Sequence, residues 1–505
     1  DQMIDTPTNN FCTLNPLSKI GSPTYGEGNL YGHVGNDVEV RGTIGMPPET
    51  KWYWEVRNDL ATYGEYTNIG VADPTATTII YSSTNEGIAY YANNGYIYKG
   101  TVAGASYGAT YANGDIIGVA LNLVDDEITF YKNNVSQGTA TGIPTTVPLY
   151  VPAMTSAAQA ACIFNFGQDS SFAGNETAQG NQDGNEIGDF YYEPPSGYLA
   201  LCTSNLPDPE IKLPGDHFNT VLYTGNGTSG SSTQAISGAG FQPDTVWIKA
   251  RDYADNWNLY DAVRGTTEKL VQNLNYAEVD TGGLTSFDSD GFGLTGDDTQ
   301  WNNNGTLYVS WNWLAGGRPT ATNVATSGAM TANSVSLNGS LQAAYTPSGS
   351  PGKYPTGMSI NTTNGSSIVR WTGASAADTL PHGLSETPEL IIYKAVDTTS
   401  EWIVGSGAPA VMSWTQYLVL NAVAAKAYSA SAWSDAAPDA NLFTIGAFGA
   451  TDSFISYCFH SIEGYSKVGT YIGNGNVDGA FFYIGFRPAW ILVKSSESAR
   501  DWQVF

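Results

Sequence analysis

A signature repeated three times in the second half of the chain limits its possible folds more than any other feature. Each copy has a proline, a lysine six residues later and a tryptophan eight residues after that lysine. The short run between proline and lysine reads DTVWIK, ELIIYK or AWILVK, which is typical of a buried strand. The spacing therefore predicts tandem β-rich units of one fold. The copies are Pro243, Lys249 and Trp257; Pro388, Lys394 and Trp402; and Pro488, Lys494 and Trp502.

The signature residues allow two interpretations each. The tryptophans could stack on sugar rings, or each could fill a core, and their fixed distance from an apolar strand favours the core. The lysines could share a ligand, or each could cap the exposed end of the strand before it, and we expect the cap. On either interpretation the signature is mainly structural.

Composition indicates an all-β protein. Charged residues make up only 13%, whereas the chain has 57 glycines, 31 tyrosines and 13 tryptophans. Helical bundles and coiled coils need more Glu, Lys, Leu and Ala than this, while β-proteins with many tight turns need glycine and aromatic residues. We expect tandem β-sandwich domains, of jelly-roll or similar type, joined by extended linkers.

Strand-like segments in the first half point to a particular sandwich. KWYWEV and YTNIGVA come first, then GDIIGVALNLVDDEITFYKNN, and finally FNFGQ, with Asn-Gly and Asn-Asn turns between strands. These runs, from about Tyr25 to Phe172, resemble a SPRY domain. The resemblance implies a two-sheet sandwich that binds partners through loops at one end and has no catalytic residues.

Domain boundaries follow from these patterns and from the Pro- and Gly-containing stretches between them. We expect a third repeat that is only partial, and a protein that extends beyond both Asp1 and Phe505. The expected division is a lead-in arm 1–24, a SPRY-like sandwich 25–173, a linker 174–215, repeat 1 at 216–317, a linker 318–365, repeat 2 at 366–464 and partial repeat 3 at 465–505.

The net charge limits the classes of partner that the chain can bind. The net charge is -27, so the chain would repel nucleic acid and anionic membrane surfaces. No apolar stretch is long enough to span a bilayer, and the first residues do not form a signal peptide. We expect neither nucleic acid nor membrane insertion.

The sequence offers no catalytic set, metal site or cofactor motif. The four cysteines and four histidines are scattered, and we expect the cysteines, Cys12, Cys162, Cys202 and Cys458, to be buried thiols. Asp288 to Gly291 begins like a calcium loop but lacks the later acidic ligands, so a plain turn is favoured over calcium binding. We expect no enzyme, because a polysaccharide depolymerase would need a long β-helix with its own short repeat.

The whole chain also resembles a class of tailed-bacteriophage virion proteins. The lead-in DTPTNNFCTLNP, the passage PSGYLALCTSNLP, and the repeats with YTGNG, GFQPDTVWIK, YIGNG and GFRPAWILVK carry the resemblance. It implies a tail fibre or surface fibre on the virion, a homotrimer that contacts other virion proteins and a host-surface glycan or protein. The alternatives are a capsid-decorating or tail-connecting protein without a receptor role, or a depolymerase.

Tyrosine-rich loops of the SPRY-like unit are the candidate recognition surface. They lie around Asp59–Tyr66, Tyr91–Tyr98 and Ala103–Asn113 and hold almost no Lys or Arg. Tyrosine gives a large contact area at low entropic cost, so these loops suit a neutral sugar or a polar protein patch. The candidate binding residues are Tyr63, Tyr66, Tyr96, Tyr98, Tyr107 and Tyr111.

Overall fold

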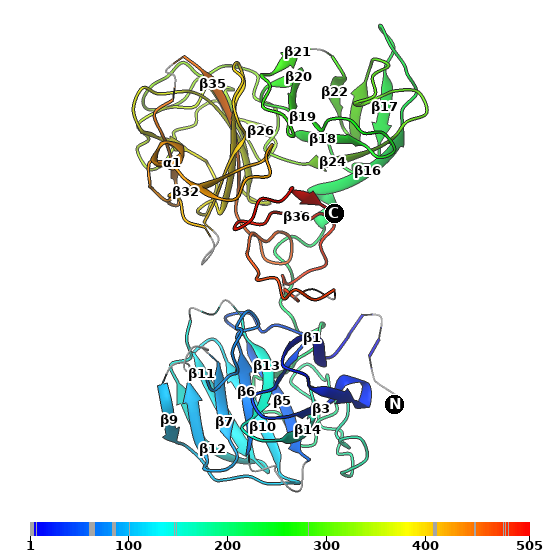
Figure 1. Ribbon diagram of the computed structural model, residues 1–505, viewed down its shortest axis with the longest axis vertical. Coiled ribbons are helices and arrows are strands. Elements are labelled where there is room, and N and C mark those ends of the chain that lie inside the picture. Colours follow the sequence, from blue (N-terminus) through cyan, green and yellow to red (C-terminus); the bar gives the residue numbers. More distant parts are fainter. Residues whose placement is uncertain are drawn as a thin grey trace. The chain divides into compact units, whose positions relative to one another are not determined.

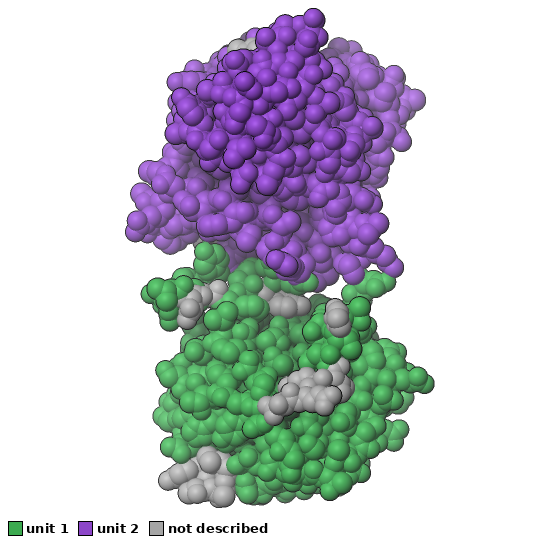
Figure 2. Space-filling model, turned by 90° about the vertical axis from the view of Figure 1, so that its right-hand side faces the viewer, with its two compact units in different colours: residues 1–208, 471–485 green, residues 209–470, 486–505 purple. Residues whose placement is uncertain are grey.

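The structure divides the chain into two compact units. One comprises residues 1–208 with 471–485, and the other comprises 209–470 with 486–505; Figure 2 colours the two surfaces. The computed structural model describes residues 5–6, 8–59, 66–82, 87–99, 102–145, 147, 149–280, 282–407, 412–448, 451–477, 479, 481–482 and 484–505.

Two packed β-sheets form the first unit (Figure 1). One runs in the order β1 (Leu14–Ile20), β4 (Glu39–Gly42), β13 (Val151–Ser156), β6 (Thr67–Ala72), β7 (Ile88–Tyr91), β8 (Tyr96–Lys99) and β9 (Val102–Ser106). The other runs β12 (Val135–Thr141), β11 (Glu127–Lys132), β10 (Ile116–Asn122), β5 (Lys51–Asn58), β14 (Ala160–Asn165), β3 (Tyr31–Val34) and β2 (Thr24–Gly26), with 3-10 turn η1 (Glu27–Asn29) after β2.

Alternation along each strand decides which side chains form the core. Ile88 and Tyr90 of β7 and Ile97 of β8 lie in the main core between the sheets. Ala89, between the first two, belongs to a separate small cluster on the outer face. Successive side chains of a strand point to opposite faces, so Tyr91 and Tyr98 also lie on the outer face.

The segment that follows β14 folds back onto the SPRY-like sandwich through one buried carboxylate. Glu55 accepts hydrogen bonds from the backbone N–H groups of Tyr191 (2.9 Å) and Tyr192 (2.7 Å) and from Asn165 Nδ2 (3.0 Å). Desolvation raises the pKa of this carboxyl to about 7. Strand β15 (Leu199–Ala200) then pairs with β5, so most of the stretch expected to be a linker is packed against the first unit.

The first repeat pairs a large sheet with a small one. The six-stranded sheet runs β16 (Phe218–Thr224), β24 (Leu307–Trp313), β18 (Thr245–Ala250), β19 (Asn258–Asp261), β20 (Gly265–Val271) and β21 (Val279–Asp280). The other contains β17 (Gln234–Ser237), β23 (Gly291–Leu294) and β22 (Leu284–Asp288), and 3-10 turn η3 (Pro214–Asp216) precedes β16. Their facing side chains, such as Val246 and Phe292, form one core.

The second repeat contains the same strand order. Its sheet runs β26 (Ser340–Leu341), β25 (Val335–Leu337), β27 (Gly357–Asn361), β28 (Ser366–Thr372), β35 (Ser453–Phe459), β30 (Leu390–Ala395), β31 (Ile403–Ser406), β32 (Gln416–Val419) and β33 (Ala427–Tyr428). From β28 onward this order matches β16 to β21 of repeat 1. The smaller sheet pairs β29 (Asp378–Pro381) with β34 (Leu442–Ile445), and the third repeat contributes the pair β36 (Leu492–Val493) and β37 (Gln503–Val504).

The repeats share a further core inside the second unit. It joins Trp247 and Trp311 of repeat 1 to Ile455 and Trp402 of repeat 2, and Trp490 of the third repeat packs against it. An apolar core therefore joins the repeats.

The all-β class is confirmed. Strands account for 39% of the chain and helix for 2%, counted over the residues that the structure describes. The one α-helix in those ranges is α1 (Ala430–Trp433), a single turn capped by the Ser429 hydroxyl. Among the described residues, no helix has the length and apolar character needed to cross a membrane.

Candidate interaction surfaces

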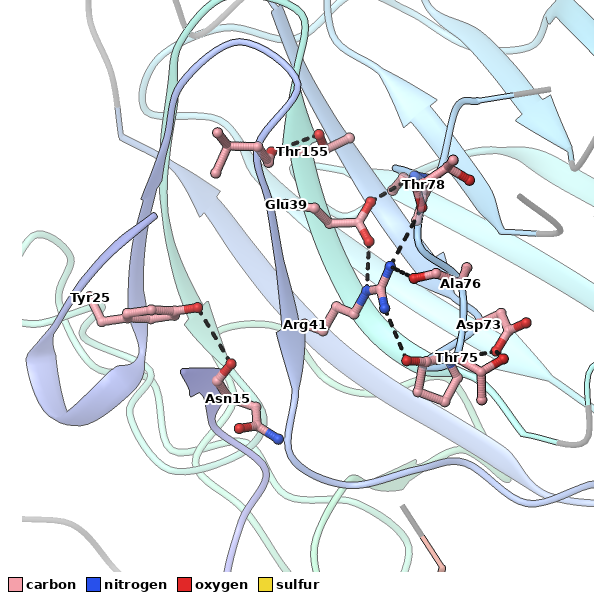
Figure 3. Close-up of polar contacts among 12 residues, drawn as sticks. Asn15, Tyr25, Glu39, Arg41, Asp73, Thr75, Ala76, Thr78 and Thr155 are labelled. Atoms are coloured by element: carbon pink, nitrogen blue, oxygen red, sulfur yellow. Dashed lines mark hydrogen bonds and ion pairs between the residues drawn. The ribbon is translucent and has the colours of Figure 1, made fainter. Parts of the chain in front are cut away.

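The outer face of the seven-stranded sheet carries a loop that is strapped down by a buried ion pair (Figure 3). Glu39 and Arg41 alternate with core residue Val40 on β4, so both point away from the main core. They are almost fully buried, because residues 73–82 cross over them. We refer to residues 73–82 as the strap.

The ion pair holds the strap through its backbone. Arg41 Nε lies 2.7 Å from Glu39 Oε1, and the guanidinium donates to the carbonyls of Pro74 (3.0 Å) and Ala76 (2.9 Å). Glu39 Oε2 accepts the backbone N–H of Ile80 at 2.6 Å. Burial raises the pKa of Glu39, while Arg41 acts against that shift. Both charges are thus satisfied by each other and by the strap.

Tyrosines gather beside the strap on this outer face. The ring of Tyr98 lies 6.4 Å from that of Tyr81 and 6.2 Å from that of Tyr91. The Tyr81 hydroxyl donates to Asp37 Oδ1 at 2.7 Å. Gly104 gives the Tyr98 ring its room, because a Cβ there would lie 2.6 Å from Cζ. We call Tyr81, Tyr91, Tyr96 and Tyr98 the tyrosine face.

The structure separates the six tyrosines predicted as contact residues. Tyr96 and Tyr98 belong to strand β8 rather than to a turn, and Tyr96 is 37% exposed. Tyr66 is partly exposed just before β6, and Tyr63 lies outside the described residues. Tyr81 was not predicted, and Tyr91 was predicted only as the first residue of a candidate loop, since only a fold places both beside Tyr98.

The other two predicted tyrosines, Tyr107 and Tyr111, pack within the SPRY-like sandwich. Tyr111 is 2% exposed, and its hydroxyl donates to the carbonyls of Tyr90 (2.8 Å) and Thr67 (3.1 Å). The expectation that Tyr111 is exposed is therefore wrong, because its hydroxyl is needed by buried carbonyls. Tyr107 is half-buried, packs against Tyr90 and donates its hydroxyl to the carbonyl of Gly138.

The repeated lysines fix the loop that follows their strand. Lys394 Nζ donates to the carbonyls of residues one and four positions later, Ala395 (2.5 Å) and Thr398 (3.2 Å). Lys249 makes the same two contacts with Ala250 and Tyr253, and Lys494 makes them with Ser495 and Ser498. Desolvation lowers the pKa of Lys394 to about 8. The ammonium thus shapes the loop that leads to the tryptophan, while Pro243 and Pro388 are buried before the strand and Pro488 is half-buried.

The tryptophan of the second repeat docks onto the first repeat. Trp402 is 1% exposed, and its indole N–H donates to the carbonyls of Val271 (3.0 Å) and Leu274 (3.2 Å). The backbone N–H of Glu278 donates to the Val396 carbonyl at 2.7 Å. The β20–β21 turn of repeat 1, residues 271–278, is therefore a socket for repeat 2.

The third repeat uses the same contacts on the second. Trp502 Nε1 donates to the Val419 carbonyl at 2.8 Å, and the Lys426 N–H donates to the Ser496 carbonyl at 2.8 Å. The sheet registers make the positions equivalent, since Asn258 pairs with Val271 as Ile403 pairs with Val419. Trp402 is thus a core residue whose core lies between repeats, whereas Trp257 and Trp502 are half-buried.

A cavity of about 730 Å³ opens in the second repeat. Its lining includes Trp414, His460 and the carboxylates of Glu386, Glu389 and Asp435. Glu389 Oε2 also accepts the backbone N–H of Ser461 at 2.7 Å. Carboxylates beside an indole can accept hydrogen bonds from hydroxyl groups, so the cavity suits a small polar ligand.

Other groups considered for chemistry have structural partners. The four cysteines are buried and unpaired with one another, as expected. Residues Asp288 and Gly291 pair across the β22–β23 hairpin, and Asp290 accepts the N–H groups of Gly238 and Gly240. Within the described ranges, no group of three or more His, Cys, Asp or Glu residues is placed to hold a metal ion.

Comparison with solved structures finds SPRY domains. The SPRY domain of human HERC1 is 16% identical, covers 30% of this chain and 96% of its own, and gives a TM-score of 0.27. The TRIM65 PSpry domain is 14% identical over 31% and 92% of the two chains, with a TM-score of 0.26. Stonustoxin is 16% identical over 31% and 27%, also with a TM-score of 0.26.

Family models cover most of the sequence. The SPRY domain model matches residues 51–169, and no curated protein matches the chain. A second model, described as a domain of unknown function (DUF7483), matches twice, at residues 213–346 and 339–505. The first unit therefore contains a SPRY domain, a further β-rich region follows it, and the chain belongs to the DUF7483 family.

Proposed function

We propose that this protein is a non-enzymatic structural protein of a tailed-bacteriophage particle, displayed at the virion surface as a tail or surface fibre. In this proposal the SPRY domain and loops of the repeats bind a host-envelope glycan or protein, and the chain also contacts other virion proteins. A SPRY domain in an all-β chain fits a protein-interaction or binding role. The resemblance of the whole chain to virion proteins supports the finer assignment.

The tyrosine face is the observation that carries the binding role. Tyr81, Tyr91 and Tyr98 form a contiguous aromatic group beside the exposed Tyr96. The ion pair of Glu39 and Arg41 fixes the adjacent strap, so the surface is ordered before a ligand arrives. Pre-ordered aromatic side chains lose little entropy on binding, which is why they favour recognition.

A double variant tests this role. Tyr96→Ala with Tyr98→Ala removes the exposed tyrosine and the ring that contacts both Tyr81 and Tyr91, and we expect host adsorption of the particle to fall at least tenfold while particles still assemble. Tyr428→Ala is the matched control, because Tyr428 is 66% exposed in the second repeat and lies outside this face. Normal adsorption by the double variant would reject the binding surface.

A capsid-decorating or tail-connecting role is the second candidate. The repeated docking of Trp402 and Trp502 favours it, because such contacts suit a rigid connector. Failed assembly of the double variant, with the control assembling normally, would favour this role. Labelling of an inserted loop in electron micrographs of the particle would then locate the protein.

A further inference from the structure

Equivalent positions in the first two repeats differ in burial. Trp402, Ile455 and Lys394 of repeat 2 are 1%, 0% and 0% exposed. Their counterparts in repeat 1, Trp257, Val309 and Lys249, are all partly exposed. Among the described residues the indole N–H of Trp257 has no hydrogen-bond acceptor, whereas that of Trp402 has two.

The difference has a single cause within the second unit. Repeat 2 is covered by the turn 271–278 of repeat 1, and repeat 3 is covered by the turn 419–426 of repeat 2. Both turns offer a valine carbonyl to the indole and a backbone N–H to the loop after the lysine. Repeat 1 presents the same lysine, loop and tryptophan, but both described turns are already docked elsewhere.

The repeat-1 face has the remaining features of the docked ones. Arg251 stands two residues after Lys249, as Val396 and Ser496 stand two residues after their lysines. Val309 and its neighbour across the sheet, Leu222, which is 60% exposed, provide apolar area. Trp257 is held ready by stacking on Trp311, with ring centroids 5.6 Å apart.

We propose that this face binds the β-hairpin turn of a further repeat of the same family, carried by a partner protein chain. The turn's valine carbonyl accepts the Trp257 indole N–H, and its last residue donates a backbone N–H to the Arg251 carbonyl. The two known turns read VQNLNYAE and VLNAVAAK, so the expected partner has valine, then asparagine two residues on, and alanine six residues after the valine.

The last residue of the turn does not decide which turn binds. Lys426 of the second turn lies 2.5 Å from Glu497 of repeat 3, which is three residues after its lysine. Repeat 2 has Asp397 at that position, yet it is covered by the turn that ends in Glu278. Asp252 of repeat 1 accepts the backbone N–H of Leu307 as Asp397 accepts that of Ser453. The repeat-1 face therefore matches that of repeat 2 and accepts a turn of either kind.

The test uses a peptide of known sequence and the full chain. A cyclised hairpin of residues 416–428, QYLVLNAVAAKAY, is titrated into protein carrying nitrogen-15 in its indole groups. We expect a saturable downfield shift of one indole signal, identified as Trp257 by its absence from Trp257→Phe. A peptide with glutamate in place of its lysine should also bind, because the turn that covers repeat 2 ends in Glu278.

One variant keeps the proposal falsifiable. Trp257→Phe retains an aromatic ring on Trp311 but has no indole N–H to donate, so it should abolish the response. An unchanged Trp257 signal at millimolar peptide would overturn the proposal. Equal peptide binding by Trp257→Phe would also overturn it, because the site would then lie elsewhere.

Discussion

Replacing Trp402 by alanine should destabilise the second unit far more than the same change at Trp257. The two residues occupy the same place in the signature, but only Trp402 reaches a neighbouring repeat. Truncating a fully buried tryptophan costs about 3–5 kcal/mol. The carbonyls of Val271 and Leu274 would also lose their donor, at about 1–3 kcal/mol if water does not replace it.

Replacing Trp257 by alanine should cost less free energy of unfolding than replacing Trp402. Its indole makes no hydrogen bond among the described residues, and its ring is partly exposed. It stacks on Trp311 and lies 5.7 Å from the Trp247 ring, and aromatic pairs contribute about 0.5–1.5 kcal/mol beyond area burial. We expect a loss of about 2 kcal/mol at Trp257 and of at least 5 kcal/mol at Trp402.

Urea unfolding followed by tryptophan fluorescence measures the difference. Of the 13 tryptophans, only Trp52 and Trp54 lie in the first unit, so the signal reports the second. With a slope of about 1–3 kcal/mol per molar urea, the midpoints of the two variants should differ by at least about 1 M. Trp402→Phe should fall between them, because it keeps most of the ring but loses the N–H. Equal midpoints for the two alanine variants would refute the assignment of Trp402 to an inter-repeat contact.

Three further outcomes can be measured on the intact chain. Arg41→Met leaves the buried Glu39 without its ion partner, so the first unit should lose about 3–5 kcal/mol of stability in thermal unfolding. Adding Glu39→Leu should restore part of this stability, whereas additive losses would contradict the pairing. Burial raises the pKa of Glu55 from 4.5 to about 7 and that of Asp244 from 3.8 to about 6. The contribution of each group to the free energy of unfolding should therefore be complete below its unfolded pKa and should be lost as the pH rises through its folded pKa. Glu55→Gln should flatten this decline in calorimetric scans between pH 5 and 8, and an unchanged slope would contradict the reasoning. Burial raises the pKa of Cys12 to about 11 and that of Cys458 to about 12, so a thiol reagent should label these residues only after unfolding. Labelling is measured by mass spectrometry, and rapid labelling of the native protein would show that these thiols are accessible.

Patterns within single strands were predicted well from the sequence. The runs before Lys249 and Lys394 are strands β18 and β30, and the turn at Asp288 to Gly291 closes a hairpin. Local periodicity reports which face of a strand is apolar, and turn chemistry reports where the strand ends. Both signals lie within a few residues, so a single sequence contains them.

The segments that cover a strand face could not be predicted from such local patterns. Glu39 and Arg41 alternate with an apolar residue, a pattern typical of solvent-exposed charges, yet a strap more than thirty residues away buries them. Tyr111 sits in a Gly- and Asn-rich stretch typical of a surface loop, but two carbonyls draw its hydroxyl inward. Such long-range contacts depend on the assembled fold and leave no periodic trace.

The position of each socket along the chain also affects how the protein is made. The turn 271–278 precedes the segment that docks on it, Val396 to Trp402, and the turn 419–426 precedes Trp502. The ribosome synthesises the chain from its N-terminus, and domains generally fold in the order in which they are synthesised. Repeats 2 and 3 therefore emerge beside a docking surface that has already been synthesised, and Trp402 and Trp502 can dock as soon as the loop after the lysine is complete. A folded repeat provides the docking surface for the repeat that follows it, which shortens the time that these tryptophans spend exposed to other nascent chains.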